Sequence, residues 1–153
     1  MDGQPIWETY FRKGDTVTIL RCSLLHQTDF DSLLKEPDTF YIGKKTCLLP
    51  FLTIRDNLMI GLPKEKQAAS LAEIKKLQHF FKLPNTIKSQ HPDVLSPEQL
   101  FLIHLIRSLI LDNRLIIVNC VELKLPRFFV SALQPALELL AEQHPFKLIF
   151  LIK

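Results

Sequence analysis

Residues 95–118 read LSPEQLFLIHLIRSLILDNRLIIV, and this stretch decides the fold of the chain. Its first part predicts a helix, because Ser96 is a favoured N-cap, Pro97 suits the first helical position and Gln99 completes a capping box. The helix should run to about Leu111. Apolar residues cover most of its circumference, so we expect a buried helix and not an amphipathic surface helix.

Strands are expected on both sides of a second helix in the C-terminal third. Residues 115–118 and 146–152 are continuous apolar runs without alternation, typical of strands covered on both faces. Between them, residues 127–143 carry a helical apolar stripe, which Pro135 should break or kink. With another β-branched run at 16–20, this order predicts an α/β fold with a mainly parallel sheet and helices on both faces.

The middle of the chain predicts further helices. Residues 51–58 lie between breakers and favour a short helix with Thr53 as its N-cap. Residues 64–82 have apolar positions at three- and four-residue spacing, which predicts an amphipathic helix that Pro84 ends. Residues 21–40 are mixed, with hints of helical turns.

Composition excludes several classes of protein. The chain has 153 residues, 19 Lys and Arg against 16 Asp and Glu, a net charge of +3 and four glycines, too few for a dinucleotide fingerprint or an ordinary phosphate loop. The small positive surplus does not indicate nucleic-acid binding. Three cysteines without a CxxC pair indicate neither a disulfide framework nor a zinc ribbon. With no secretory signal and no spanning segment expected, we predict a cytoplasmic protein without a metal site.

The order and spacing of these segments resemble ATP-binding cassette (ABC) ATPase domains. The signature motif would lie at Leu95, Ser96, Pro97, Glu98 and Gln99, and residues 115–118, followed by Asn119 and Cys120, resemble the Walker B strand. Upstream, residues 48–58 look like the segment after the Q-loop, and residues 14–20 look like the strand before the P-loop. The resemblance implies a truncated P-loop NTPase fold: a single domain over 1–153, with about 64–111 as helical subdomain and signature helix.

The phosphate-loop positions that the resemblance implies lack every glycine and the lysine of the family. They include Arg21, Leu24, His26, Gln27 and Thr28. A phosphate loop needs glycines so that consecutive backbone N–H groups can converge on the anion, and a lysine that neutralises it. Leu24 and His26 block that path and Gln27 brings no charge, whereas Thr28 still suits a magnesium-binding hydroxyl. We therefore expect no ATP or magnesium cofactor.

The other motif positions have changed as well. Asn119 stands where the family has a magnesium-ordering aspartate, and Cys120 where it has the glutamate base. Two interpretations of Cys120 follow. It is a thiol nucleophile, which needs a His or Asp partner, or it is a small buried residue at the end of a strand. Pro97 and Glu98 replace two signature glycines, which removes an N–H donor and adds a charge that repels phosphate. Lys44 replaces the Q-loop glutamine, so we expect no ATPase activity and assign no catalytic residue.

The first functional hypothesis is a non-catalytic, ABC-ATPase-like protein that acts as a protein-binding or regulatory module, associated with an ABC transporter. In the resembled family the region from Q-loop to signature helix receives a helix of the membrane subunit. The docking segment here would be Leu49, Pro50, Phe51, Leu52 and Thr53. The partner would be an ABC permease, an intact ATPase subunit, a regulatory protein or a second copy of the chain, at the inner face of the cell membrane and in only indirect contact with it.

Two alternatives stay open. The chain could be the degenerate ATP-binding subunit of an asymmetric ABC ATPase whose partner supplies the active site. It could also be a sensor that uses Arg21, Lys44 and Lys45 to hold a different small anion.

Overall fold

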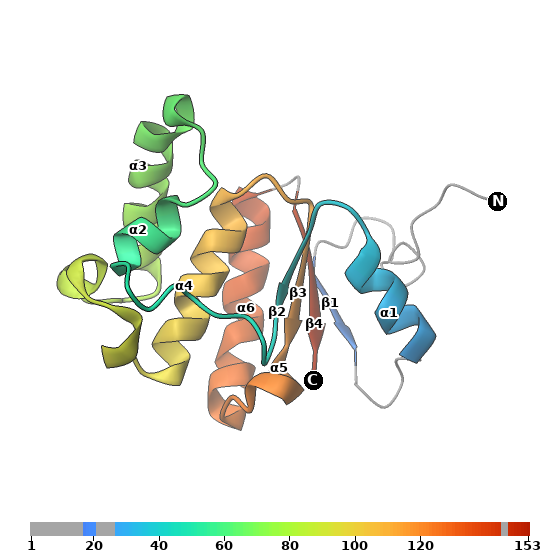
Figure 1. Ribbon diagram of the computed structural model, residues 1–153. Helices are drawn as coiled ribbons and strands as arrows, with labels where there is room; N and C mark the ends of the chain where they lie inside the picture. The colour runs from blue at the N-terminus through green and yellow to red at the C-terminus, as the bar shows by residue number, and fades with distance from the viewer. Residues whose placement is uncertain (1–16, 21–26, 145–146) are drawn as a thin grey trace. The chain divides into compact units, whose positions relative to one another are not determined.

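The computed structural model describes residues 17–20, 27–144 and 147–153 (Figure 1). Its contacts divide the chain into two compact units. The first, here called the sheet unit, comprises Met1–Lys45 and Asn113–Lys153. The second, the helical unit, comprises Thr46–Asp112.

The sheet unit is built on a parallel four-stranded sheet in the order β1-β4-β3-β2. The strands are β1 (Val17–Leu20), β2 (Thr39–Ile42), β3 (Leu115–Asn119) and β4 (Leu148–Ile152). In the central pair, Ile117 lies opposite Phe150. Every residue of β3 is buried, and so are the last four of β4. The predicted strands are confirmed, and their unbroken apolar runs have the expected cause: both strands lie inside the sheet.

Strand β2 was not predicted. The region 21–40 was expected to be mixed with helical turns, and it contains helix α1 (Gln27–Lys35) followed by this strand. β2 is an edge strand of four residues, TFYI, and only its last residue is fully buried. A short, half-buried aromatic run carries too little periodicity to be recognised without its partner β3.

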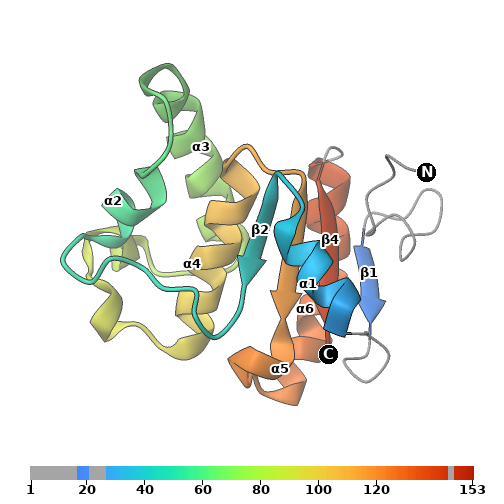
Figure 2. The ribbon, with the colours of Figure 1, turned by 45° about the vertical axis from the view of Figure 1, so that its right-hand side comes forward.

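Helices cover both faces of this sheet. Figure 2 shows α1 in front of the strands and α6 (Arg127–Gln143) behind them. On the α1 side, Leu33 packs with the buried cluster Leu115, Ile117, Phe150 and Ile152. On α6, Leu133, Leu137, Leu140 and Ala141 are buried. This arrangement confirms the α/β class, with helices on both faces of a parallel sheet.

Of the two effects expected of Pro135, a break or a kink, the break does not occur: α6 is continuous from Arg127 to Gln143. Proline removes the hydrogen bond to the carbonyl four residues earlier, which here belongs to Ser131. Both Pro135 and Ser131 are exposed, so water can satisfy that carbonyl and the helix continues.

The structure describes every residue of the helical unit, which contains three α-helices and two short 3₁₀ helices. They are α2 (Ile54–Met59), α3 (Lys64–Phe80), η3 (Asn85–Ser89), η4 (Pro92–Val94) and α4 (Pro97–Ile110). Helix α4 packs against α2 and α3. It begins as predicted: Gln99 N–H donates to the Ser96 hydroxyl at 3.2 Å, and Ser96 N–H donates to the Gln99 side chain at 3.0 Å.

Helix α3 ends before Pro84, at Phe80. Lys82 adopts a left-handed conformation with φ of 56°, and its N–H donates to His79 O at 3.0 Å. Leu83 N–H donates to Gln78 O at 3.0 Å. These two bonds form a Schellman motif, which closes the helix two residues earlier than the proline would. Among the described residues, no helix has both the length and the apolar character needed to cross a membrane.

His104 is a buried titratable group on α4. Its side chain is 5% exposed, and Nδ1 has no hydrogen-bond partner among the described residues. Burial, together with the nearby Arg107 charge, lowers the pKa of His104 from 6.5 to about 4. The folded protein therefore resists a protonation that the unfolded chain accepts.

This difference predicts a loss of stability in acid. Because the unfolded chain binds the His104 proton between pH 6.5 and 4 and the folded chain does not, stability should fall through that window, by about 3 kcal/mol at pH 4 from this residue alone. Urea unfolding at neutral pH and at pH 4 measures the loss. His104→Leu removes the titration, so its stability should fall by about 3 kcal/mol less over the same window. Equal losses in the two proteins would contradict the assignment.

Candidate functional site

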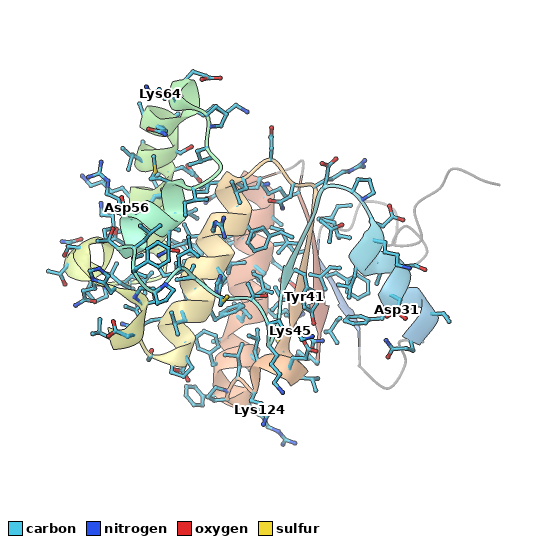
Figure 3. The ribbon with its side chains drawn as sticks, in the orientation of Figure 1. Asp31, Tyr41, Lys45, Asp56, Lys64 and Lys124 are labelled. Atoms are coloured by element: carbon cyan, nitrogen blue, oxygen red, sulfur yellow. The ribbon has the colours of Figure 1, made fainter. Side chains whose placement is uncertain are left out.

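A closed hydrogen-bond cluster occupies the carboxyl edge of the sheet. β3 ends at Asn119, and the short helix α5 (Cys120–Leu123) begins at the next residue. The Asn119 side chain accepts from Glu122 N–H at 3.1 Å and donates to the Tyr41 hydroxyl at 3.1 Å. The Tyr41 hydroxyl donates to the Glu122 carboxylate, and Lys44 N–H donates to the same carboxylate oxygen at 3.2 Å. Tyr41, labelled in Figure 3, therefore connects β2 to the end of β3.

Gly43 allows the chain after β2 to approach this cluster. A Cβ atom at Gly43 would collide with the Tyr41 ring and with the Glu122 carboxylate. The sequence reasoning missed Glu122, although a signal was present: Asn119-x-x-Glu122 has the spacing of a capping box. Glu122 is a carboxylate close to the Walker B position, but Tyr41 and Lys44 N–H already hold it.

The environment of Cys120 keeps its thiol protonated. It is 7% exposed, and burial raises the pKa of its thiol to about 11 against the opposing effect of Lys153. The adjoining cavity of about 440 Å³ is lined by Cys120, Val121, Leu125, Arg127, Val130, Ser131 and Lys153. No His or Asp is among these described residues, so nothing lining the cavity could deprotonate the thiol. The geometry favours the small buried residue over the nucleophile.

The phosphate-loop positions divide into two groups. Arg21, Leu24 and His26 lie outside the described residues. Gln27 and Thr28 are exposed and form the first turn of α1. The Gln27 side chain donates to Asp31 at 2.9 Å, and Thr28 O accepts from the Ser32 hydroxyl at 2.9 Å. Both interactions are internal to the helix.

The signature positions form the start of α4. Leu95 is 8% exposed and anchors the segment, while Ser96 and Gln99 are bonded to each other in the capping box. Pro97 has no N–H, and Glu98 adds a carboxylate in the first turn. The usual attraction of a helix N-terminus for an anion is therefore opposed here by a negative side chain and a missing donor.

The expected docking segment is held by one buried amide, that of Asn57. Asn57 is 3% exposed; its side chain donates to Leu49 O at 3.0 Å, Leu52 O at 3.3 Å and Thr53 O at 3.0 Å, and accepts from Leu49 N–H at 2.8 Å. A backbone bond from Leu52 N–H to Leu49 O closes the turn. Thr53 then caps α2 by accepting from Asp56 N–H at 3.2 Å. We call residues 49–53 the Asn57-held turn.

This turn presents apolar side chains to solvent. Phe51 is 72% exposed and Leu49 is 42% exposed, and Pro50 between them is also exposed. With Leu49 and Pro50 beside it, the exposed Phe51 ring forms a small apolar patch, and an exposed apolar patch can bind a partner. The sequence reasoning selected these residues from the resemblance alone, and it missed Asn57.

Among the described residues, no three His, Cys, Asp or Glu side chains come together in a way that could hold a metal ion. The absence of a metal site stays a prediction for the whole chain.

No family model and no curated protein matches the sequence. Among solved structures, the chain is similar to the ATP-binding cassette MJ0796 in a dimeric post-hydrolysis state bound to ADP and Pi. The TM-score is 0.57 at 16% identity, over 85% of this chain and 57% of that chain. A second structure, the dimeric bacterial ABC transporter cassette MJ0796, gives 0.56 at 15% identity, over 74% of this chain and 51% of that one.

The fold is that of an ABC cassette. The resemblance read from the order of the motifs is thereby confirmed at the level of fold, over most of the chain. This cassette-like chain spans little more than half the length of the cassettes that it matches. ADP and Pi are ligands of the matched protein. At 15–16% sequence identity, the similarity shows a shared fold and nothing about ligands of this chain.

Removing the Asn57 side chain should destabilise the cassette-like fold. Asn57→Ala leaves Leu49 N–H and up to three carbonyls without their buried partner, so the free energy of unfolding should fall by about 3 kcal/mol. Urea denaturation measures the change. Asn85→Ala, at an exposed position of η3, is the control and should cost less than about 1 kcal/mol. Equal effects of the two substitutions would show that the turn does not depend on the buried amide.

Proposed function

We propose that this chain is a non-catalytic, ABC-ATPase-like protein that acts by binding another protein, as a docking or regulatory module associated with an ABC transporter. The observation that carries the proposal is the Asn57-held turn, which is hydrogen-bonded to one buried amide and leaves the apolar side chains of Leu49 and Phe51 exposed. Rigid aromatic side chains are frequent anchors at protein interfaces, because they bury a large area and lose little conformational entropy on binding. Phe51 is the residue that we assign to this role.

The state of the nucleotide-site positions supports a non-catalytic role. Asn119 and Glu122 are bonded to each other and to Tyr41, and the Cys120 thiol, with a pKa of about 11, is neutral at physiological pH. A general base must accept a proton near neutral pH, and a magnesium ligand needs free oxygen atoms. The Asn119 amide and the neutral Cys120 thiol do not meet the first requirement, and one oxygen of the Glu122 carboxylate, Oε1, already accepts from Tyr41 and from Lys44 N–H.

A membrane-embedded permease subunit is the partner that we favour. In the resembled family, the segment that corresponds to the Asn57-held turn belongs to the surface that receives a helix of the membrane subunit. An intact ATPase subunit, a regulatory protein or a second copy of this chain would use the same exposed side chains. These other partners are outcomes of the experiment below.

The first test is a titration of the full chain with ATP, with and without magnesium, followed by calorimetry and by thermal unfolding. A ligand at 100 times its dissociation constant stabilises a protein by about 2.7 kcal/mol, which a melting curve resolves easily. We expect neither heat nor a shift. Binding in the micromolar range would instead favour the second candidate, a degenerate ATP-binding subunit of an asymmetric ABC ATPase, which the match to dimeric cassettes makes worth testing.

The second test places a photo-crosslinking phenylalanine analogue at position 51 in the full chain, in the cells that produce it. We expect a covalent adduct with a membrane protein, identified by mass spectrometry. The matched control is the same analogue at Phe128, which is 78% exposed but lies on α6 in the sheet unit. Equal adduct patterns at the two positions, or none at position 51, would contradict the proposed docking role. Adducts between two copies of the chain would identify self-association.

A further inference from the structure

A basic groove runs along one side of the helical unit. It consists of two adjoining cavities of about 590 and 650 Å³, which share Ala72, Lys75 and Lys88 in their walls. The first is lined by Thr53, Arg55, Leu71, Ala72, Lys75, Lys88 and Ser89, and the second by Ala72, Lys75, Lys76, Gln78, His79, Asn85 and Lys88. Because the shared residues connect the cavities, we treat them as one surface, the basic groove.

Local structure holds the walls in place. Ile54 N–H donates to Gln90 O at 2.8 Å, which ties the start of α2 to the end of η3. The Gln78 side chain donates to Pro84 O at 2.8 Å and fixes the end of α3 to the beginning of η3. The groove is thus bounded by three elements that are bonded to each other, and its shape is present before any partner arrives.

The charge of the groove is of one sign. Arg55, Lys75, Lys76 and Lys88 line it together with His79, and no Asp or Glu is among the lining residues. None of the four cations forms an ion pair with another residue in the described part of the chain; Lys66, which pairs with Asp112 at 3.4 Å, lies outside the groove. Four unpaired cations in a concave surface attract a partner that carries several negative charges.

The lining narrows the chemistry of that partner. A surface that binds a lipid bilayer inserts several exposed apolar side chains among the acyl chains. The exposed large hydrophobic residues of the helical unit, which are Leu49, Phe51, Ile60 and Val94, do not line the walls of the groove, and only the turn that carries Leu49 and Phe51 adjoins its end. Non-specific binding of single-stranded nucleic acid uses Phe, Tyr or Trp as stacking platforms, and the groove has none. Several separated cations also suit a chain of carboxylates better than one small anion, which needs donors that converge on a point.

The groove begins where the Asn57-held turn ends. Thr53 is the last residue of that turn and lines the first cavity, next to Arg55. A segment that covers Phe51 could therefore continue into the groove. We infer that the partner docks through an acidic, amphipathic protein segment, with apolar side chains on Phe51 and Asp or Glu side chains along Arg55, Lys75 and Lys88. This inference rests on the proposed docking function and specifies the chemistry of the partner.

The test uses the full chain and a fluorescein-labelled synthetic amphipathic helix built of Leu, Ala and Glu, with binding followed by fluorescence anisotropy. The comparison peptide has Gln in place of every Glu. We expect the Glu peptide to bind at least about tenfold more tightly, and this advantage to shrink as salt is raised from about 50 to about 300 mM.

Charge reversal in the groove should remove this preference. Lys75→Glu with Lys88→Glu should weaken binding of the Glu peptide by at least about tenfold. The matched control is Lys64→Glu with Lys124→Glu, which changes the net charge equally at two exposed lysines outside the groove, both labelled in Figure 3; it should weaken binding by less than about twofold. If melting curves show that the reversal unfolds the chain, Lys75→Gln with Lys88→Gln replaces it, with a smaller loss in the same direction.

Three outcomes would overturn the inference. The first is equal binding of the Glu and Gln peptides. The second is an equal loss of Glu-peptide affinity in the groove and control variants. The third is tight, groove-dependent binding of phosphatidylserine vesicles or of a single-stranded oligonucleotide, without binding of the Glu peptide. Failure here is distinguishable from failure of the docking function. A crosslink at position 51 that persists in the Lys75 and Lys88 variants would retain the docking function and reject the groove. Groove-dependent peptide binding without any crosslink at position 51 would retain the groove as a binding site for acidic segments and reject the docking function of the Asn57-held turn.

Discussion

The apolar strands β3 and β4 impose the constraint on which the sheet unit depends. Both lie inside a parallel sheet and are almost entirely buried, so each face of the sheet must be covered. Helix α1 covers one face through Leu33, and α6 covers the other. Parallel pairing also brings the carboxyl ends of all strands to one edge. Whatever stands after each strand, here Gly43 after β2 and Asn119 at the end of β3, is therefore forced into the same neighbourhood.

In nucleotide-binding folds, the ligand binds at the carboxyl edge of the sheet. In this chain, the described residues at that edge are hydrogen-bonded to one another. Tyr41, Asn119 and Glu122 satisfy one another, and Gly43 provides the space for them. The Glu122 carboxylate is exposed, and its Oε1 accepts from the Tyr41 hydroxyl and from Lys44 N–H, which links the loop after β2 to α5. The same edge position can therefore serve catalysis in one sequence and local stability in another.

The surface features share one structural principle. At the Asn57-held turn, one buried amide holds the backbone of residues 49–53 with four hydrogen bonds. At the basic groove, two hydrogen bonds fix the walls, and the lysine and arginine side chains remain available. Preorganised surfaces pay less conformational entropy on binding, so both are better suited to recognition than flexible loops of the same composition.

Much of the architecture followed from the sequence. Three features depend on neighbours along the chain, and periodicity or spacing reveals them. They are the capping box at Ser96 and Gln99, the apolar strand predicted at 115–118 and the Thr53 cap. β2, the continuity of α6 at Pro135 and the early end of α3 were not predicted, because pairing with β3, exposure of Ser131 and a left-handed Lys82 decide them.

The sequence by itself determined the α/β class and the order of the elements from the Thr53-capped helix onward, because these depend on residue type and spacing along the chain. Only the tertiary structure decided that Glu122 is held by Tyr41, that Asn57 supports the turn presenting Phe51, and that Arg55, Lys75 and Lys88 line one groove. Tyr41 and Glu122 are 81 positions apart, and Arg55 and Lys88 come from different helices. The physical reason is that hydrogen bonds and electrostatic fields act over distances in space, which folding creates between residues that are remote along the chain.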